Sequence, residues 1–301
     1  MSMFRRTDYR AHRRLVDPAR EKAQLWRLIM GLILASGVYL ICNQTMYRTL
    51  FTWQGKNVEA FARSLAAGTT PIAMYLTLLS FGFMILGVAI ALRVVHNRGL
   101  PAALGDGQLF RQQMVSVLVL LILINIAIWV LPPWDLGAPL VPNMNLSLWA
   151  VLLPFSLVAV FIQVSAEEIL FRGYIQQQLA ARFNSPLIWM LMPAGLFGLG
   201  HYLPDTAGPN ALPIALWAMI FGIMMADLTA RAGTLAPAIA VHFINNVTAI
   251  LIVSLPDELS GLSLYLSPFS LDDTETVRAW LPVEFGFMIV SWLGARLAIR
   301  R

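Results

Sequence analysis

Charged residues are scarce in this chain. They make up 12% of its 301 residues, whereas hydrophobic residues make up 58%. Ordinary soluble domains contain about 25% charged residues, so a soluble protein of this composition could not cover its own surface. Cysteine is nearly absent as well. Cys42 stands alone, which excludes an internal disulfide and leaves the redox compartment undetermined.

The hydrophobic residues are gathered in blocks of about 20, the length needed to cross a hydrocarbon core of about 30 Å. Eight blocks are found, at about 25–46, 70–92, 112–131, 147–166, 187–203, 211–230, 234–255 and 283–299. The sequence therefore predicts an all-α, polytopic membrane protein with eight transmembrane helices. We expect a basic cytosolic arm (1–24) followed by a single transmembrane domain (25–301). A cleavable signal peptide is not expected, because the first block follows a long charged arm and is too long for a signal segment.

Lysine and arginine are distributed unevenly between the two sides that these spans define. Eight of the 21 lie within the first 27 residues, and placing alternate loops inside puts all but four on one face. This is the positive-inside bias, so both termini are predicted to be cytoplasmic. The outer loop 256–282 is acidic, which agrees with this orientation. We interpret the basic arm as a topology signal that contacts membrane lipid, and not as a segment that binds nucleic acid.

Polar side chains are confined to the second half of the apolar sequence. Ionisable groups at membrane depth cost about 2.5–3.5 kcal/mol each on insertion scales, so they usually face a protein interior or a wet cavity and mark function. The catalytic or binding core is therefore expected in spans four to seven. The polar residues of these spans are Gln163, Glu167, Glu168, Arg172, His201, Asp227, His242, Asn245 and Asn246.

The fourth block leads into a continuous helix-forming stretch, which predicts one long helix over 148–183. Glu168 and Arg172 are four residues apart on this helix and can form an ion pair on one face. That pair would leave Glu167, about 100° round the helix, without a local partner. A partly buried carboxylate of this kind suits a general base. The simpler alternative is that both glutamates lie among wet headgroups at a helix end.

The turn Asn184-Ser185-Pro186 lets depth in the membrane be compared between helices. Glu167 lies 17 residues before Asn184, and His201 lies 17 residues after it. In an antiparallel helix pair both would be about 25 Å from the turn, so they can face each other. His242 and Asn246 are likewise four apart on one face of the seventh span.

This set of side chains suits hydrolysis of a peptide bond. Glu167 could deprotonate a water with the help of His201, while His242 and Asn246 could donate hydrogen bonds to the developing oxyanion. The alternative is a metal site with Glu167, His201 and His242 as three zinc ligands and an open fourth position. The HExxH pattern of zincins is absent.

Three motifs in order carry a resemblance to a known family. Glu167-Glu168-x-x-x-Arg172, Phe197-x-x-x-His201 and His242-x-x-x-Asn246 are similar to the motifs of the CAAX-protease and bacteriocin-processing (CPBP, or Abi) family of intramembrane endopeptidases. The similar region is about 150–251, one third of the chain.

The resemblance implies an eight-helix protease in a bacterial cytoplasmic membrane that cuts a peptide or protein substrate near its C-terminus or beside a membrane segment. Glu167 would be the base and His201 its partner, with His242 and Asn246 as the oxyanion site. Glu168, Arg172 and Phe197 would support them, and we expect Asn245 to tune the site. No cofactor is favoured, because Asn and Glu are poorer zinc ligands than a full His₃ or His₂Glu set. Zinc stays the alternative.

Two other classes of function remain open from the residues. The chain could be a catalytically silent membrane binding or immunity protein that uses the same cavity. It could also be a transporter with a Glu/His proton relay, although no inverted repeat is visible between its halves. Asp227 and Arg231, at the inner end of span six, are expected to form a surface ion pair.

Overall fold

The computed structural model describes residues 9–131, 139–256 and 258–300. The first eight residues of the basic arm, and Asp257 of the acidic outer loop, lie outside these ranges. The helices are η1 Arg10–His12, α1 Arg13–Val16, η2 Asp17–Lys22, α2 Leu25–Gln54, η3 Gly55–Asn57, α3 Val58–Ala67, α4 Pro71–Ser80, α5 Gly82–His96, α6 Pro101–Leu104, α7 Gly107–Val130, α8 Leu146–Glu168, η4 Ile169–Gln176, α9 Gln177–Arg182, α10 Pro186–Gly200, α11 Pro204–Ala207, η5 Gly208–Asn210, α12 Ala211–Ala232, α13 Ala236–Val247, η6 Thr248–Ile252 and α14 Thr274–Ala298. A small sheet has the order β1-β3-β2, with β1 Val141–Pro142, β2 Val253–Ser254 and β3 Tyr265–Leu266.

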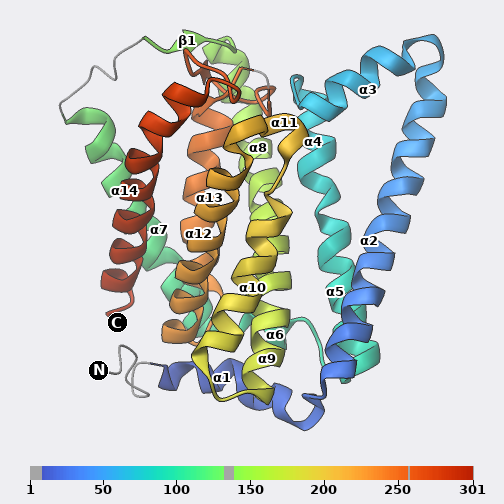
Figure 1. Ribbon diagram of the computed structural model, residues 1–301, viewed down its shortest axis with the longest axis vertical. Helices are drawn as coiled ribbons and strands as arrows, with labels where there is room; N and C mark the ends of the chain where they lie inside the picture. The colour runs from blue at the N-terminus through green and yellow to red at the C-terminus, as the bar shows by residue number, and fades with distance from the viewer. Residues whose placement is uncertain (1–8, 132–138, 257, 301) are drawn as a thin grey trace.

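The described chain is an all-α membrane bundle with a minor sheet at one end. In Figure 1, α8, α10, α12 and α13 lie between an outer pair formed by α7 and α14 and a second group formed by α2, α4 and α5. Local sequence signals explain several helix starts. Thr70 and Asp106 cap α4 and α7 with their side-chain oxygens, and Pro186 occupies the first turn of α10, where a missing N–H costs nothing.

Six helices within the described ranges are long and apolar enough to span a membrane. The fifth and seventh predicted spans correspond to shorter apolar helices, Pro186–Gly200 and Ala236–Ile252, so the count of eight crossings stays a prediction. The helix α14, which contains the eighth predicted span, begins at Thr274 rather than at 283, because Asp273 caps its start with a side-chain oxygen. The predicted helix over 148–183 is present as a continuous stretch over Leu146–Arg182. Its middle, η4, is π-helical.

The described part of the basic arm is packed onto the bundle. Tyr9, His12, Leu15 and Val16 are buried, and the arm's helices lie across the same end of the molecule as the last turn of α14 (Figure 1). Gly233 follows α12 with a φ of +73°, and a Cβ there would lie 2.5 Å from the carbonyl oxygen of Ala11. The positive φ and the close approach of the Ala11 carbonyl oxygen therefore both require glycine at this position.

The expected surface ion pair of Asp227 and Arg231 is buried instead. Arg231 Nε lies 2.8 Å from Asp227, and the two side chains are only 12% and 8% exposed. The same carboxylate accepts hydrogen bonds from Tyr9 at 2.8 Å and from Trp292 at 3.0 Å. The spacing of four residues predicted the pair, but its burial comes from the arm and α14, which are distant in sequence.

His12 makes the attachment of the arm dependent on pH. Its ring lies 4.7 Å from that of Trp189, and its Nε2 has no hydrogen-bond partner among the described residues. Burial lowers the pKa of His12 to about 3, so the packed imidazole is neutral. A detached arm would have an ordinary pKa of about 6.5 and would bind a proton first as the pH falls. Stability of the attached state is therefore complete above about pH 6.5 and is lost as the pH falls from there toward 3.

We expect the amide-exchange protection factors of residues 10–22 to fall about tenfold between pH 7.5 and 5.5, since one proton is gained on detachment. The His12→Gln variant should show no such decrease beyond the effect of pH on intrinsic exchange. Equal decreases in the two proteins would contradict the role of His12.

Candidate active site

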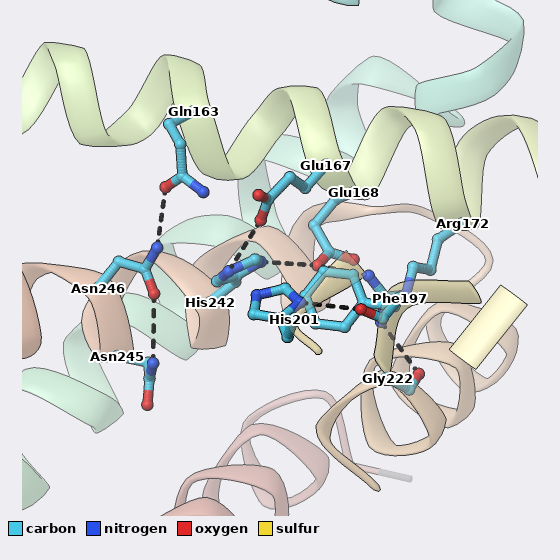
Figure 2. Close-up of polar contacts among 10 residues, drawn as sticks. All are labelled: Gln163, Glu167, Glu168, Arg172, Phe197, His201, Gly222, His242, Asn245 and Asn246. Atoms are coloured by element: carbon cyan, nitrogen blue, oxygen red, sulfur yellow. Dashed lines mark hydrogen bonds and ion pairs between the residues drawn. The ribbon is translucent and has the colours of Figure 1, made fainter. Parts of the chain in front are cut away.

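Three of the central helices bring the predicted residues together. The helix α8 contributes Gln163, Glu167 and Glu168, and Arg172 follows in η4. Phe197 and His201 lie at the end of α10, while α13 contributes His242, Asn245 and Asn246. Figure 2 shows these side chains converging between the helices. Arg172 lies in the π-helical segment directly after Glu168, and such segments are frequent at functional sites.

The expected pairing of Glu168 with Arg172 is present and fully buried. Arg172 Nη1 donates to Glu168 Oε1 at 2.9 Å, and the side chains are 1% and 0% exposed. The same guanidinium donates from Nη2 to the carbonyl of Gly222 on α12 at 3.1 Å and lies over the ring of Phe197. A Cβ at position 222 would lie 3.0 Å from the Cα of Ala194, so glycine allows α10 and α12 to approach at this point.

His242 lies between the two adjacent glutamates. Its Nδ1 lies 2.8 Å from Glu168 Oε1 and forms a hydrogen bond with it, while its Nε2 lies 3.3 Å from Glu167 Oε2. Glu168 therefore fixes the orientation of the ring, in the way that a carboxylate orients the imidazole of a catalytic triad. Glu167 is 12% exposed, so it is the more accessible of the two carboxylates.

His201 has a different neighbour from the one expected. Its Nδ1 is 2.8 Å from the carbonyl oxygen of Phe197, a backbone acceptor that makes Nδ1 the donor and leaves Nε2 as the acceptor. Within the described ranges no hydrogen bond or ion pair joins His201 to Glu167. The equal distances from the turn predicted similar heights for these two residues, but His242 is the imidazole within reach of Glu167.

Both imidazoles are nevertheless neighbours of one phenylalanine. The ring of Phe197 lies 4.5 Å from that of His201 and 6.1 Å from that of His242. Phe221 on α12 packs edge-on against His242 at 5.0 Å. These aromatic rings restrict the rotamers of the histidines and form the apolar wall of the site.

Asn246 belongs to a chain of amides rather than standing alone. Its Nδ2 donates to Gln163 Oε1 at 2.8 Å, and its Oδ1 accepts from Asn245 Nδ2 at 3.2 Å. Gln163 was not among the predicted site residues. The signal that could have identified it is its spacing, because it precedes Glu167 by four residues and so lies on the same face of α8.

The zinc site considered from sequence stays the alternative to metal-free chemistry. Among the residues that the structure places, no group of three or more His, Cys, Asp or Glu side chains is gathered closely enough to hold a metal ion. Nδ1 of His242 is held by Glu168 and Nδ1 of His201 by a backbone carbonyl, which leaves Nε2 of each ring as the atom that could bind a metal, as is usual for zinc-binding histidines.

An apolar groove of about 380 Å³ lies between α7 and the end of α13, and none of the candidate catalytic residues lines it. It lies on the helix that carries His242 and Asn246. Ile122, Ile126, Trp129 and Val130 line its α7 side and are exposed at the protein surface, so the groove opens where lipid would surround the bundle.

Comparison with known proteins identifies the region that carries the site. A family model described as type II CAAX prenyl endopeptidase Rce1-like matches residues 148–248. The chain is also 25% identical over 257 residues to the uncharacterized protein YyaK of Bacillus subtilis (strain 168), covering 82% of this chain and 84% of that protein. No solved structure matches. The resemblance to the CAAX-protease and bacteriocin-processing family is confirmed by the family match, which indicates an intramembrane CAAX-type protease.

Proposed function

We propose that this chain, whose residues 148–248 carry the core of the CAAX-protease family, is an intramembrane endopeptidase that hydrolyses a peptide bond in a membrane-associated or C-terminal segment of its substrate. The observation that carries the proposal is the position of Glu167, a largely buried carboxylate within 3.3 Å of His242 Nε2. A site for activating water needs such a carboxylate next to a proton donor.

In the proposed reaction, Glu167 takes a proton from a water molecule, and the resulting hydroxide attacks the carbonyl carbon of the substrate. The oxyanion that forms accepts hydrogen bonds from His242 and from Asn246. Glu167 then delivers its proton to the amine as the C–N bond breaks, so that a carboxylic acid and an amine leave the site and Glu167 returns to its starting state. His201 assists by accepting a hydrogen bond from the attacking water at Nε2.

The donor role of His242 in this proposal requires an N–H at Nε2, the nitrogen that faces Glu167, in addition to the one at Nδ1. A charged imidazole has an N–H at both nitrogens. Nδ1 donates to Glu168, and once Glu167 has taken the proton of the water and become a weaker acceptor, the N–H at Nε2 can bind the oxyanion instead.

The partner that we propose is a peptide or protein substrate that lies partly in the lipid. We place the chain in the bacterial cytoplasmic membrane with both termini in the cytoplasm and the basic arm against lipid headgroups. The fold is consistent with this, since the arm and the end of α14 lie at one end of the bundle (Figure 1).

The proposal is tested with purified protein in vesicles and an internally quenched peptide ending in Cys-aliphatic-aliphatic-X, in farnesylated and unprenylated forms. A single-span reporter protein serves as the second substrate. Mass spectrometry should find one cleaved peptide bond in at least one of the three. Tight binding of all three without cleavage would favour a silent binding protein instead.

We expect the activity to be metal-free. Dialysis against 1,10-phenanthroline should leave the cleavage rate unchanged, because no three side chains of ligand type are gathered among the described residues. Loss of activity that zinc ions restore would contradict this expectation and favour the metal mechanism. Addition of zinc to untreated protein controls for inhibition by excess metal.

A further inference from the structure

Three side-chain amides form a directed chain that ends beside the reactive carboxylate. Asn245 donates to Asn246, and Asn246 donates to Gln163. In each of these bonds the carbonyl oxygen is the acceptor, so the last free group of the chain is the NH₂ of Gln163. Among the described residues, Gln163 Nε2 has no hydrogen-bond partner.

The direction of the chain follows from electrostatics. Reversing all three amides would keep both hydrogen bonds but would turn the carbonyl oxygen of Gln163 toward the side of Glu167. Two acceptor oxygens would then face each other without a proton between them. The arrangement in Figure 2, with the nitrogen of Gln163 on the side of Glu167, avoids this repulsion.

The free NH₂ is open to a ligand. Gln163 as a residue is only 7% exposed, but its Nε2 is not one of the fully buried side-chain atoms that lack a hydrogen-bond partner, so a substrate group can reach it. It lies one helical turn from Glu167, where neighbouring side chains on a helix meet. A substrate carbonyl attacked by the water on Glu167 would lie within reach of this amide.

We propose that Gln163 Nε2 is a further oxyanion donor of the site, held in place by Asn246 and Asn245. This inference rests on the proposed hydrolase function. Asn246 retains a second N–H, so two amides and His242 can surround the oxyanion. The substrate feature recognised by Gln163 is the carbonyl oxygen of the scissile bond, which every peptide substrate has. Loss of the donor should therefore lower the rate for all substrates alike.

The test compares two glutamines of the same long helical stretch. Gln163→Met keeps side-chain length and removes the donor, and Gln178→Met is its matched control, because Gln178 is 2% exposed and has no hydrogen bond to the described residues. We expect kcat of the peptide assay to fall about 10²–10³-fold in Gln163→Met, with KM changed less than about threefold. The control should stay within about threefold of wild type in both constants.

A second variant keeps the inference testable if Gln163→Met fails to fold. Gln163→Glu retains an oxygen that accepts from Asn246 but has no amide N–H. Wild-type kcat in Gln163→Glu, or equal rates in Gln163→Met and Gln178→Met, would overturn the donor role. The proposed function itself is judged separately, by whether wild type cleaves and Glu167→Gln does not.

Discussion

Glu167→Gln should lower kcat for cleavage of the quenched peptide by about 10²–10⁴-fold. The amide has nearly the shape of the carboxylate but cannot take a proton from water, and a positioned general base contributes a factor of that size. Binding of the peptide should persist, because the substitution removes no apolar surface. The measurement is a steady-state rate in vesicles, together with the dissociation constant of an uncleaved peptide.

Glu59→Gln is the matched control, because Glu59 lies exposed on α3, away from the site. Its rate should equal that of wild type, and both variants should melt within about 2 °C of it. Full activity in Glu167→Gln would refute the assigned mechanism. An unchanged phenotype of a Glu167→Gln strain would point to the silent binding protein.

Of the variants proposed, Arg172→Met should lower the free energy of unfolding the most. Removing the guanidinium leaves the buried Glu168 with its hydrogen bond to His242 but without its ion-pair partner, and breaking a buried ion pair typically costs about 3–5 kcal/mol. It also leaves the carbonyl of Gly222 without its donor. We expect a clear decrease in the midpoint of thermal unfolding in detergent, and loss of activity because Glu168 no longer holds His242 in place.

The double variant Arg172→Met/Glu168→Gln separates the charge effect from packing. Because it removes both charges, it should recover a large part of the lost stability, and the coupling energy from the cycle should exceed about 1 kcal/mol. Arg278→Met, at an exposed position of α14, should leave the midpoint unchanged. Additive effects of the two single substitutions would show that the pair contributes little.

Contacts within one helix could be read from the sequence. The spacing of Glu168 and Arg172 gave their ion pair, and the long helix through Arg172 was predicted to within two residues at its start and one at its end. These features depend on the helical repeat alone.

Contacts between helices could not be read in the same way. Counting residues from a turn gives height but not the rotation of each helix about its axis, so it could not decide whether His201 or His242 faces Glu167. Gln163 was noted as a polar residue of the fourth span but was given no role, because it belongs to none of the three motifs. Its proposed role depends on Asn246, which lies opposite it in the structure.

The packing of the arm shows a third limit. Its basic residues predict contact with lipid, which stays a prediction, but they did not predict that Tyr9 and His12 are buried against α12 and α10. The burial of Asp227 was missed because Tyr9 and Trp292, two of its three partners, come from the two ends of the chain.

The short length of α10 has a consequence for the surrounding lipid. A helix of 15 residues is about 22 Å long, less than the hydrocarbon thickness of an ordinary bilayer, and His201 lies directly at its end. Such hydrophobic mismatch is relieved by local thinning of the bilayer. We therefore expect the membrane around α10 to be thinner near His201, which would shorten the path by which water from the aqueous phase reaches the proposed site.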